Sequence, residues 1–357
     1  MYSISFRKLS LLIIAFFLFA ALSSCNSATP KCKKERPLVD ADGRPFIIKR
    51  GSLVFARMEN SIIVFKNKLY NFYGRENAYF TECDTGRQIP LPQGVGGGLD
   101  NAFVDNDIIY ITTGENIWTS TDMENWESGR IDVMKGFGVF NTSICKAEDT
   151  YVLMFEIGSP AEQAGTVFTA RFATSKDMKN WTLTPPECNY AKDRYTAPHC
   201  LRYLDGYFYV FYLECVQGYM PHSHGYEMCV VRSKDLIHWE RSPFTVLRPS
   251  LADRLLLNPD FNEEEREKIA TMGNINNSDM DMCEYEGQVL IHYAWGDQSE
   301  LGDDMAILAE AVYEGTMEQF LRGWFPEIEK YRPRVDPLRY YDGSTGVSSA
   351  QIKINMP

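Results

Sequence analysis

The sequence predicts an all-β fold, a five-bladed β-propeller. Two observations support this prediction: a turn phrase that is repeated at nearly constant spacing, and five hairpin-like units. The phrase has the form Ser-x-Asp-x-x-x-Trp and occurs over Ser120–Trp126, Ser175–Trp181 and Ser233–Trp239. Its aspartates lie about 55–58 residues apart, which suits four-stranded propeller blades and exceeds the period of most helical repeats.

Each phrase predicts a tight turn followed by a packed aromatic ring. In the first copy, the side-chain oxygens of Ser120 and Asp122 can accept hydrogen bonds from nearby backbone N–H groups. Trp126 can then pack between neighbouring sheets. These residues are therefore expected to stabilise the fold and not to carry out chemistry.

Between the phrases lie five units in which a strand, a tight turn and an aromatic-rich strand follow one another. Their turns contain Asn, Asp, Glu or Gly, which is typical of two-stranded hairpins. The paired segments are 61–65 with 69–73, 102–104 with 108–111, 143–145 with 151–155, 200–203 with 207–212, and 282–285 with 289–293. Five hairpins predict five blades.

The N-terminal residues 1–24 have the composition of a secretory signal, with a basic start and an apolar run over Leu9–Leu22. The segment Leu22-Ser23-Ser24-Cys25 resembles the lipobox of bacterial lipoproteins, which implies that Cys25 becomes the first mature residue and carries the acyl chains. The alternative is an ordinary signal peptide or a short membrane anchor. The resemblance implies a lipid-anchored protein of the bacterial cell envelope, either periplasmic or surface-exposed.

Residues 25–42 are rich in Lys, Pro and small polar residues, which predicts a flexible tether. The repeat runs through the rest of the chain without a break, so residues 43–357 are expected to form one propeller domain. The net charge is −12 and no basic stripe is present, which argues against a nucleic-acid partner. Contact with a membrane is expected only through the lipid anchor.

The sequence indicates no required cofactor, although a structural divalent cation in the channel would be compatible with it. There is no Cys-x-x-Cys pair. His222 and His224 lie two residues apart and lack the helical spacing of zinc signatures, so no metal ligands are predicted.

In a propeller the first strand of each blade lines the central channel. Residues just before that strand, and just after its hairpin partner, should therefore gather at one mouth. These positions carry mainly carboxylates and amides: Glu59, Asn60, Arg75, Glu76, Asp100, Asn101, Glu115, Asn141, Thr142, Glu156, Thr196, His199, Glu214, Asn277, Asp279, Asp281, Trp295, Asp297 and Gln298. Roughly half should tie loops together, because polar strand ends need partners. The others suit a sugar, which needs polar partners and an aromatic face.

These features resemble the five-bladed propeller glycosidases, the superfamily that includes glycoside hydrolase family 43 and its relatives active on arabinosides, xylosides, fructosides and anhydro-galactosides. The match rests on the three repeated phrases and on hairpins such as Ala197–Tyr209, and it covers nearly everything after residue 50. The resemblance implies a glycosidase that acts with carboxylates at the propeller mouth.

By position, the resemblance places the catalytic base at Glu59 and a carboxylate that modulates pKa at Asp100. Family 43 presents its acidic glutamate just before a Gly-Pro-His segment, where this chain has Thr196 followed by Ala197-Pro198-His199. Cleavage of a glycosidic bond needs a proton donor, so the departure at Thr196 leaves the acid to be found elsewhere.

Three residues could supply the proton: Glu214, Asp279 or His199. We favour Glu214 as the acid, with Asp279 or Glu59 as the base, because neighbouring carboxylates separate in pKa. The residues expected to bind substrate are Asn60, Arg75, Asn101, Thr196, His199, Asp281, Trp295 and Gln298.

The leading functional hypothesis is an exported, lipid-anchored glycoside hydrolase that removes a terminal sugar from an oligosaccharide or polysaccharide fragment. An inverting mechanism is implied by family analogy alone. The second hypothesis is a catalytically silent carbohydrate-binding propeller, motivated by Thr196 at the usual acid position. The third is a phosphorylase, for which only Arg75, Arg194 and His199 could bind phosphate.

Overall fold

Short strands make up most of the protein that the computed structural model describes. The described residues are 36–58, 60–74, 77–95, 100–166, 168–215, 225–297 and 306–326. The predicted signal peptide, Cys25, Glu59, Arg75 and Gln298 lie outside them. The strands are β1 (Ile48–Val54), β2 (Ser61–Phe65), β3 (Lys68–Tyr73), β4 (Tyr79–Glu82), β5 (Gln88–Pro90), β6 (Asn101–Asp105), β7 (Ile108–Thr113), β8 (Asn116–Ser120), β9 (Glu127–Arg130), β10 (Gly138–Ala147), β11 (Thr150–Ser159), β12 (Thr169–Ser175), β13 (Trp181–Leu183), β14 (Pro198–Leu204), β15 (Tyr207–Cys215), β16 (Tyr226–Ser233), β17 (Trp239–Arg241), β18 (Asn276–Tyr285), β19 (Gln288–Gly296) and β20 (Ile307–Tyr313).

The five predicted hairpins are confirmed, because β2–β3, β6–β7, β10–β11, β14–β15 and β18–β19 all pair antiparallel. The strands described form three four-stranded sheets, β2 to β5, β6 to β9 and β10 to β13, and one eight-stranded sheet. Within the larger sheet, the four strands β14 to β17 and the four strands β18, β19, β20 and β1 meet through the parallel pair Tyr226 and Asn276 of β16 and β18. The sheets therefore number four, and they do not by themselves confirm the predicted count of five blades.

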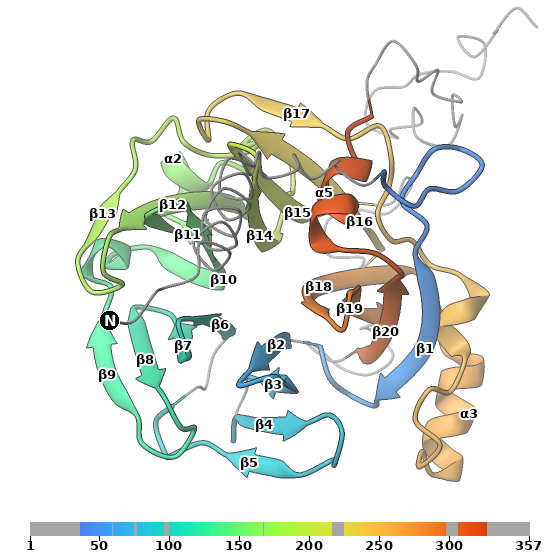
Figure 1. The fold of residues 1–357 in the computed structure, drawn as a ribbon. Coiled ribbons are helices and arrows are strands. Elements are labelled where there is room, and N and C mark those ends of the chain that lie inside the picture. The colour runs from blue at the N-terminus through green and yellow to red at the C-terminus, as the bar shows by residue number, and fades with distance from the viewer. Residues whose placement is uncertain are drawn as a thin grey trace, which may run out of the picture. The chain divides into compact units, whose positions relative to one another are not determined.

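The first strands of the hairpins lie nearest to a common centre (Figure 1). Each of β2, β6, β10 and β14 contacts the next of the series, and β18 contacts both β14 and β2. The strands β5, β9, β13, β17 and β1 lie toward the outside in the same view. This radial arrangement is that of a propeller.

Strand β1, near the start of the described residues, completes the last group of strands. It pairs antiparallel with β20, from Ile48 opposite Val312 to Val54 opposite Leu308. The backbone N–H of Leu38 donates to the hydroxyl of Tyr313 over 2.7 Å. Because the two ends of the described residues share one ladder, the ring is closed by strand pairing.

The repeated Ser-x-Asp phrases form the predicted turns between the third and fourth strands of three groups. In the first copy, Asp122 Oδ1 accepts hydrogen bonds from the backbone N–H groups of Glu124 and Asn125, both over 2.8 Å. The ring of Trp126 then stacks on Phe80 of the neighbouring sheet, with centroids 6.4 Å apart. The structural interpretation of these phrases is confirmed.

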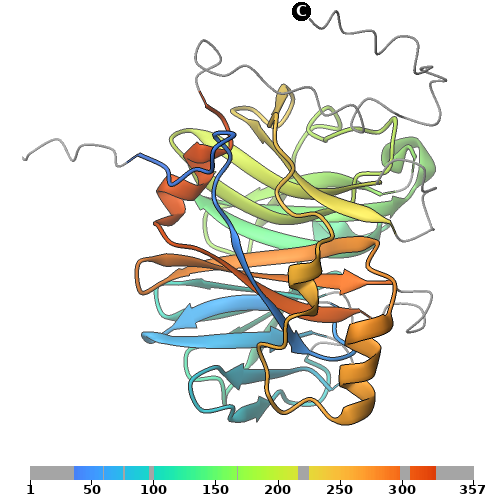
Figure 2. The ribbon, with the colours of Figure 1, turned by 90° about the vertical axis from the view of Figure 1, so that its right-hand side faces the viewer.

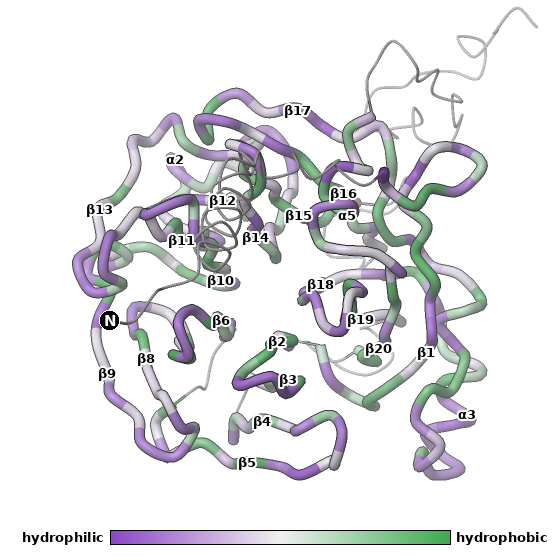
Figure 3. The backbone as a smooth tube through the Cα atoms, in the orientation of Figure 1, coloured by the Kyte–Doolittle hydropathy of each residue, from purple (hydrophilic) through white to green (hydrophobic). Residues whose placement is uncertain are grey.

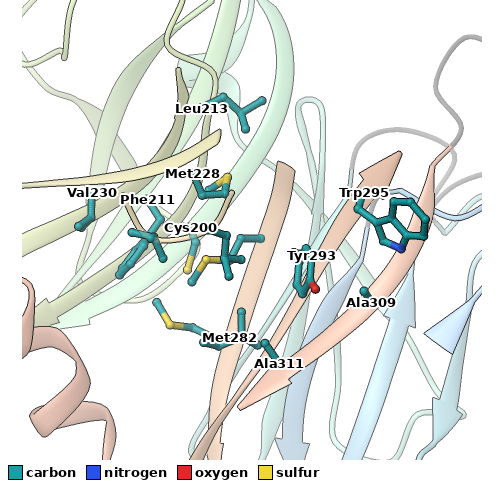
Figure 4. Packing of buried hydrophobic residues seen from close by; sticks show 14 of the residues in the cluster. Cys200, Phe211, Leu213, Met228, Val230, Met282, Tyr293, Trp295, Ala309 and Ala311 are labelled. Atoms are coloured by element: carbon teal, nitrogen blue, oxygen red, sulfur yellow. The ribbon is translucent and has the colours of Figure 1, made fainter. Parts of the chain in front are cut away.

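The strands pack through apolar side chains on both faces, and Figure 3 shows hydrophobic and hydrophilic stretches alternating around the sheets. The largest cluster joins the two halves of the eight-stranded sheet, where Phe211 and Met228 approach Met282 and Tyr293 (Figure 4). Trp295 belongs to this cluster and is fully buried. The core therefore lies between the groups of strands and holds them at fixed angles around the centre.

The short helices lie at the edges of the sheets. They are η1 (Asp132–Met134), α2 (Ala161–Ala164), η2 (Leu251–Arg254), α3 (Glu263–Thr271) and α5 (Met317–Gly323). Asn262 caps α3, and Figures 1 and 2 both place this helix beside the end of β1. Among the described residues, no helix has the length and apolar character needed to cross a membrane.

Candidate active site

The starts of the innermost strands meet around one cavity. Polar side chains dominate its lining, which draws on β6, β10, β14, β18 and the residue before β2. The lining residues are Asn60, Asp100, Asn101, Asn141, Thr142, His199, Asp279, Met280 and Asp281. The structure thus brings together six of the predicted site residues: Asp100, Asp279, Asn60, Asn101, His199 and Asp281.

Irregular pairing at the starts of three inner strands helps to place this lining. The ladders of β10, β14 and β18 each shift register, within Val139–Thr142, Pro198–Cys200 and Ser278–Asp281 respectively. In each case the inner strand has one residue more than its partner, which is a β-bulge. Bulges turn side chains away from the regular alternation, and each of these segments contributes to the cavity: Asn141, His199 and Asp279.

Asp279 has the most unusual backbone of the lining residues. Its φ angle of 50° lies in the left-handed region, which non-glycine residues seldom adopt. Its Oδ1 lies 3.4 Å from Nδ1 of His199. Its backbone carbonyl accepts a hydrogen bond from Asn60 Nδ2 over 3.4 Å. The bulge therefore places the Asp279 carboxylate beside His199 and the Asp279 backbone carbonyl beside Asn60.

Two polar atoms of the cavity lining can each take part in a further hydrogen bond. His199 Nε2 and Asn60 Oδ1 are buried and have no hydrogen-bond partner among the residues that the structure describes. Burial lowers the pKa of His199, against the opposing effect of the Asp279 charge, so its ring is neutral near pH 7. Since buried polar atoms are nearly always hydrogen-bonded in folded proteins, these two atoms are suited to a ligand.

Glu156 lies on β11 behind the cavity lining and is 3% exposed. Its Oε2 accepts hydrogen bonds from the backbone N–H of Asn141 over 3.3 Å and from Asn141 Nδ2 over 2.9 Å. Burial raises the pKa of Glu156 to about 8, opposed by the Asn141 N–H and reinforced by the negative charge of Asp279. This carboxyl is therefore protonated at neutral pH.

Tyr195 lies close to both carboxyl groups. Burial raises its pKa, and the charges of Glu156 and Asp279 contribute to the same effect. The phenol therefore keeps its proton. Glu156, Asp279 and Tyr195 form one electrostatically coupled group next to the cavity.

Other lining residues hold the inner strands together. Asn101 Nδ2 donates to Ser61 Oγ over 2.9 Å. Asp281 pairs with Arg202 over 2.8 Å through Oδ1 and accepts from the Ile62 N–H over 3.3 Å through Oδ2. Each bond joins neighbouring inner strands. Asp281, for which we predicted a binding role, thus links inner strands and also lines the cavity.

The position of Asp100 depends on a glycine in the adjacent hairpin. A Cβ atom on Gly74 would lie only 2.6 Å from the Cβ of Asp100. Because such a contact is sterically forbidden, glycine at 74 is what allows Asp100 to sit at the cavity wall.

Three predicted residues are not part of the cavity lining. The carboxylate of Glu214 pairs with Arg241, lies 3.7 Å from Arg194 and accepts a hydrogen bond from Tyr212 over 2.9 Å. The Thr196 hydroxyl contacts backbone carbonyls, including that of Ala191 over 3.3 Å. The indole N–H of Trp295 donates to Ser52 Oγ over 3.1 Å inside the core. These contacts are structural.

Sequence reasoning placed Glu156 at the mouth but gave it no catalytic role. It follows the second strand of its hairpin in the same way as Glu214, so position alone could not separate them. The two glutamates differ in their partners: the amide of Asn141 contacts Glu156, whereas a guanidinium group pairs with Glu214. That difference depends on residues distant in the sequence.

Comparison with solved structures supports the fold. The structure of a BT0996 complex with RGII is 13% identical, with 76% of this protein and 92% of that one covered and a TM-score of 0.51. A structure named "Glycoside hydrolase" is 13% identical, with 77% and 92% covered and a TM-score of 0.50. A third, "Bacteroides ovatus Xyloglucan PUL GH43B", is 10% identical, with 74% and 54% covered and a TM-score of 0.48.

No protein-family model and no curated protein matches the sequence. The predicted resemblance to propeller glycoside hydrolases is therefore confirmed at the level of the fold. At these identities the likeness shows how the protein folds and leaves its chemistry to be argued from the site.

Proposed function

We propose that this protein is a glycoside hydrolase that removes a terminal sugar from an oligosaccharide or polysaccharide fragment. The observation that carries the proposal is the coupled carboxyl pair at the cavity, in which burial and the Asp279 charge keep Glu156 protonated near pH 7. Hydrolysis of a glycosidic bond uses one carboxyl group as proton donor and a second as base or nucleophile. The shared fold with glycoside hydrolase structures supports the same class of reaction.

In the proposed reaction, Glu156 gives its proton to the glycosidic oxygen as the bond from that oxygen to the anomeric carbon breaks. Asp279 takes a proton from the attacking water, whose oxygen forms the new bond to the anomeric carbon. His199 Nε2 and Asn60 Oδ1, which have no hydrogen-bond partner among the described residues, bind hydroxyl groups of the terminal sugar. This assignment moves the acid from Glu214 to Glu156 and retains Asp279 as the base; inversion at the anomeric carbon is part of the proposal.

The rest of the proposal concerns architecture and location. The two antiparallel groups of the eight-stranded sheet would count as separate blades, which together with the three four-stranded sheets makes five. The lipobox-like segment ending at Cys25 supports a lipid-anchored protein of the bacterial cell envelope. The similar structure named as a complex with RGII supports carbohydrate as the class of ligand.

Turnover on a defined panel tests this function. Purified protein is incubated with arabinosides, xylosides, fructosides and galactosides between pH 4 and 9, and released monosaccharide is quantified by chromatography. We expect one sugar to be released by the unaltered protein, and release to be lost in Glu156→Gln and in Asp279→Asn, with circular dichroism unchanged. Binding measured by calorimetry without any turnover would instead identify a silent carbohydrate-binding propeller.

A further inference from the structure

A row of aromatic rings lies beside the carboxyl pair. Phe140 contacts Phe168 with ring centroids 4.7 Å apart, Phe168 contacts Tyr195 at 5.6 Å, and Tyr195 stacks on Tyr226 at 5.3 Å. Phe140 and Tyr226 lie near the starts of β10 and β16, and Phe168 and Tyr195 lie before β12 and β14. The row therefore lies near the starts of four strands, of which β10 and β14 also supply the cavity.

One ring within this row, that of Tyr195, lies near the reactive groups. Tyr195 interacts electrostatically with both Glu156 and Asp279. At one end of the row, Phe140 directly precedes Asn141, which is the hydrogen-bond partner of Glu156. The row of rings is thus linked to the carboxyl pair at two places, through Tyr195 and through the neighbour of Phe140.

Gly158 explains how Phe140 takes up its position. A Cβ atom at residue 158 would lie 2.8 Å from Phe140 Cε2 and 3.2 Å from Phe168 Cε1, so the two rings lie directly against the bare backbone of β11. Gly158 comes two residues after Glu156, a distance of about 7 Å along a strand. The rings of Phe140 and Phe168 therefore pack against the strand that carries the proposed proton donor.

Phe140 differs from the other rings in the row because it is exposed. Its side chain is 37% exposed, and among the described residues the only other phenylalanine as open to solvent is Phe46, at 52%. An exposed aromatic face next to polar groups is the surface on which the C–H face of a sugar stacks. Phe168 packs edge-to-face against Phe140, and Tyr195 in turn packs against Phe168.

We propose that Phe140, supported by Phe168, is the platform for the leaving sugar, the unit whose oxygen Glu156 protonates. The inference rests on the proposed function: if the terminal sugar occupies the polar cavity, the leaving sugar lies on the outer side of Glu156, where the rings are. The platform makes the enzyme selective for glycans over glycosides of small leaving groups. Phe140 is thus a specificity-determining residue for the aglycone side.

Paired substrates test the platform. A disaccharide of the sugar that the panel identifies is compared with the glycosyl fluoride of the same sugar, because fluoride is small and departs without protonation. We expect Phe140→Ala to lower kcat/KM on the disaccharide by about 2–10-fold, as the loss of one aromatic contact implies. The same variant should leave kcat/KM on the fluoride unchanged. Phe46→Ala, which alters the other exposed phenylalanine, is the matched control and should change neither value.

The outcomes separate the platform from the proposed function. Equal losses on both substrates, or no loss on either, would overturn the platform while leaving the hydrolase assignment intact. Turnover of no sugar in the panel by the unaltered protein would count against the proposed function and remove the platform with it. Normal thermal unfolding of Phe140→Ala confirms that any loss on the disaccharide does not arise from a damaged fold.

Discussion

Two glutamates at similar places in neighbouring hairpins have opposite surroundings. Glu156 on β11 is buried against the amide and backbone N–H of Asn141, and it feels the charge of Asp279. Glu214 on β15 pairs with Arg241 and lies 3.7 Å from Arg194. The comparison teaches that position in a repeat does not fix chemistry. An amide neighbour leaves a buried carboxyl protonated, whereas guanidinium groups commit a carboxylate to an ion pair.

The largest difference between Glu156 and Glu214 is expected in the effect of their substitution on catalytic activity. Replacing the proton donor removes general acid catalysis, so Glu156→Gln should lower kcat on the disaccharide by about 10²–10⁴-fold. Glu214→Gln, the matched change at the paired residue, should lower it by less than about tenfold, since an amide can still accept from Tyr212. Steady-state kinetics with purified variants measures both. A larger loss in Glu214→Gln would return the acid role to that residue.

The pH dependence of kcat/KM provides a second test of the difference between Glu156 and Glu214. Glu156 must carry its proton to act, and its pKa is raised to about 8. kcat/KM on the disaccharide should therefore fall above pH 8 by about tenfold per pH unit. The glycosyl fluoride needs no proton donor, so its profile should lack this decline. If kcat/KM declined with the same slope for both substrates, the decline above pH 8 would have to come from the titration of another group.

Replacing Glu156 should raise the free energy of unfolding, although it should lower catalytic activity. Because the pKa of Glu156 rises on folding from 4.5 to about 8, the stability associated with its protonated form is present below pH 4.5 and is lost as pH rises to about 8. Glutamine does not titrate, so the stability of Glu156→Gln should not fall in this way as the pH rises. The variant should gain on the order of 1–3 kcal/mol relative to the unaltered protein between pH 5 and pH 8. Urea unfolding at several pH values measures the difference, and a pH-independent difference would contradict the assigned environment.

The smallest effect is expected at the ion pair. Glu214→Ala leaves Arg241 and Arg194 without their carboxylate, but both guanidinium groups are more than 40% exposed and are screened by water. We expect a loss of about 1–2 kcal/mol in the free energy of unfolding at pH 7. Arg241→Ala should produce a similar loss, and the double variant should lose less than the sum. Additive losses would show that the pair is not coupled.

Much of the fold was predictable because its signals are local. The turn around Asp122 is set by side-chain and backbone groups within a few residues, and the hairpins depend on adjacent strands joined by turn residues. Ring closure was also predictable in outline, since repeats of similar length can bury their faces only against one another. The sheet count was less predictable, because a single parallel pair, Tyr226 with Asn276, merges two groups into one sheet.

The sequence by itself determined a propeller of repeated antiparallel hairpins and placed Asp100, Asp279, Asn60, Asn101 and His199 among the residues of one site. Both conclusions follow from periodicity, which maps equivalent positions to one end of the fold. Only the tertiary structure decided which carboxyl can hold a proton, that Trp295 lies in the core, and that Phe140 lies exposed against Phe168. The reason is physical: pKa and exposure depend on burial and on charges brought close in space by residues far apart in the sequence, and no local pattern records them.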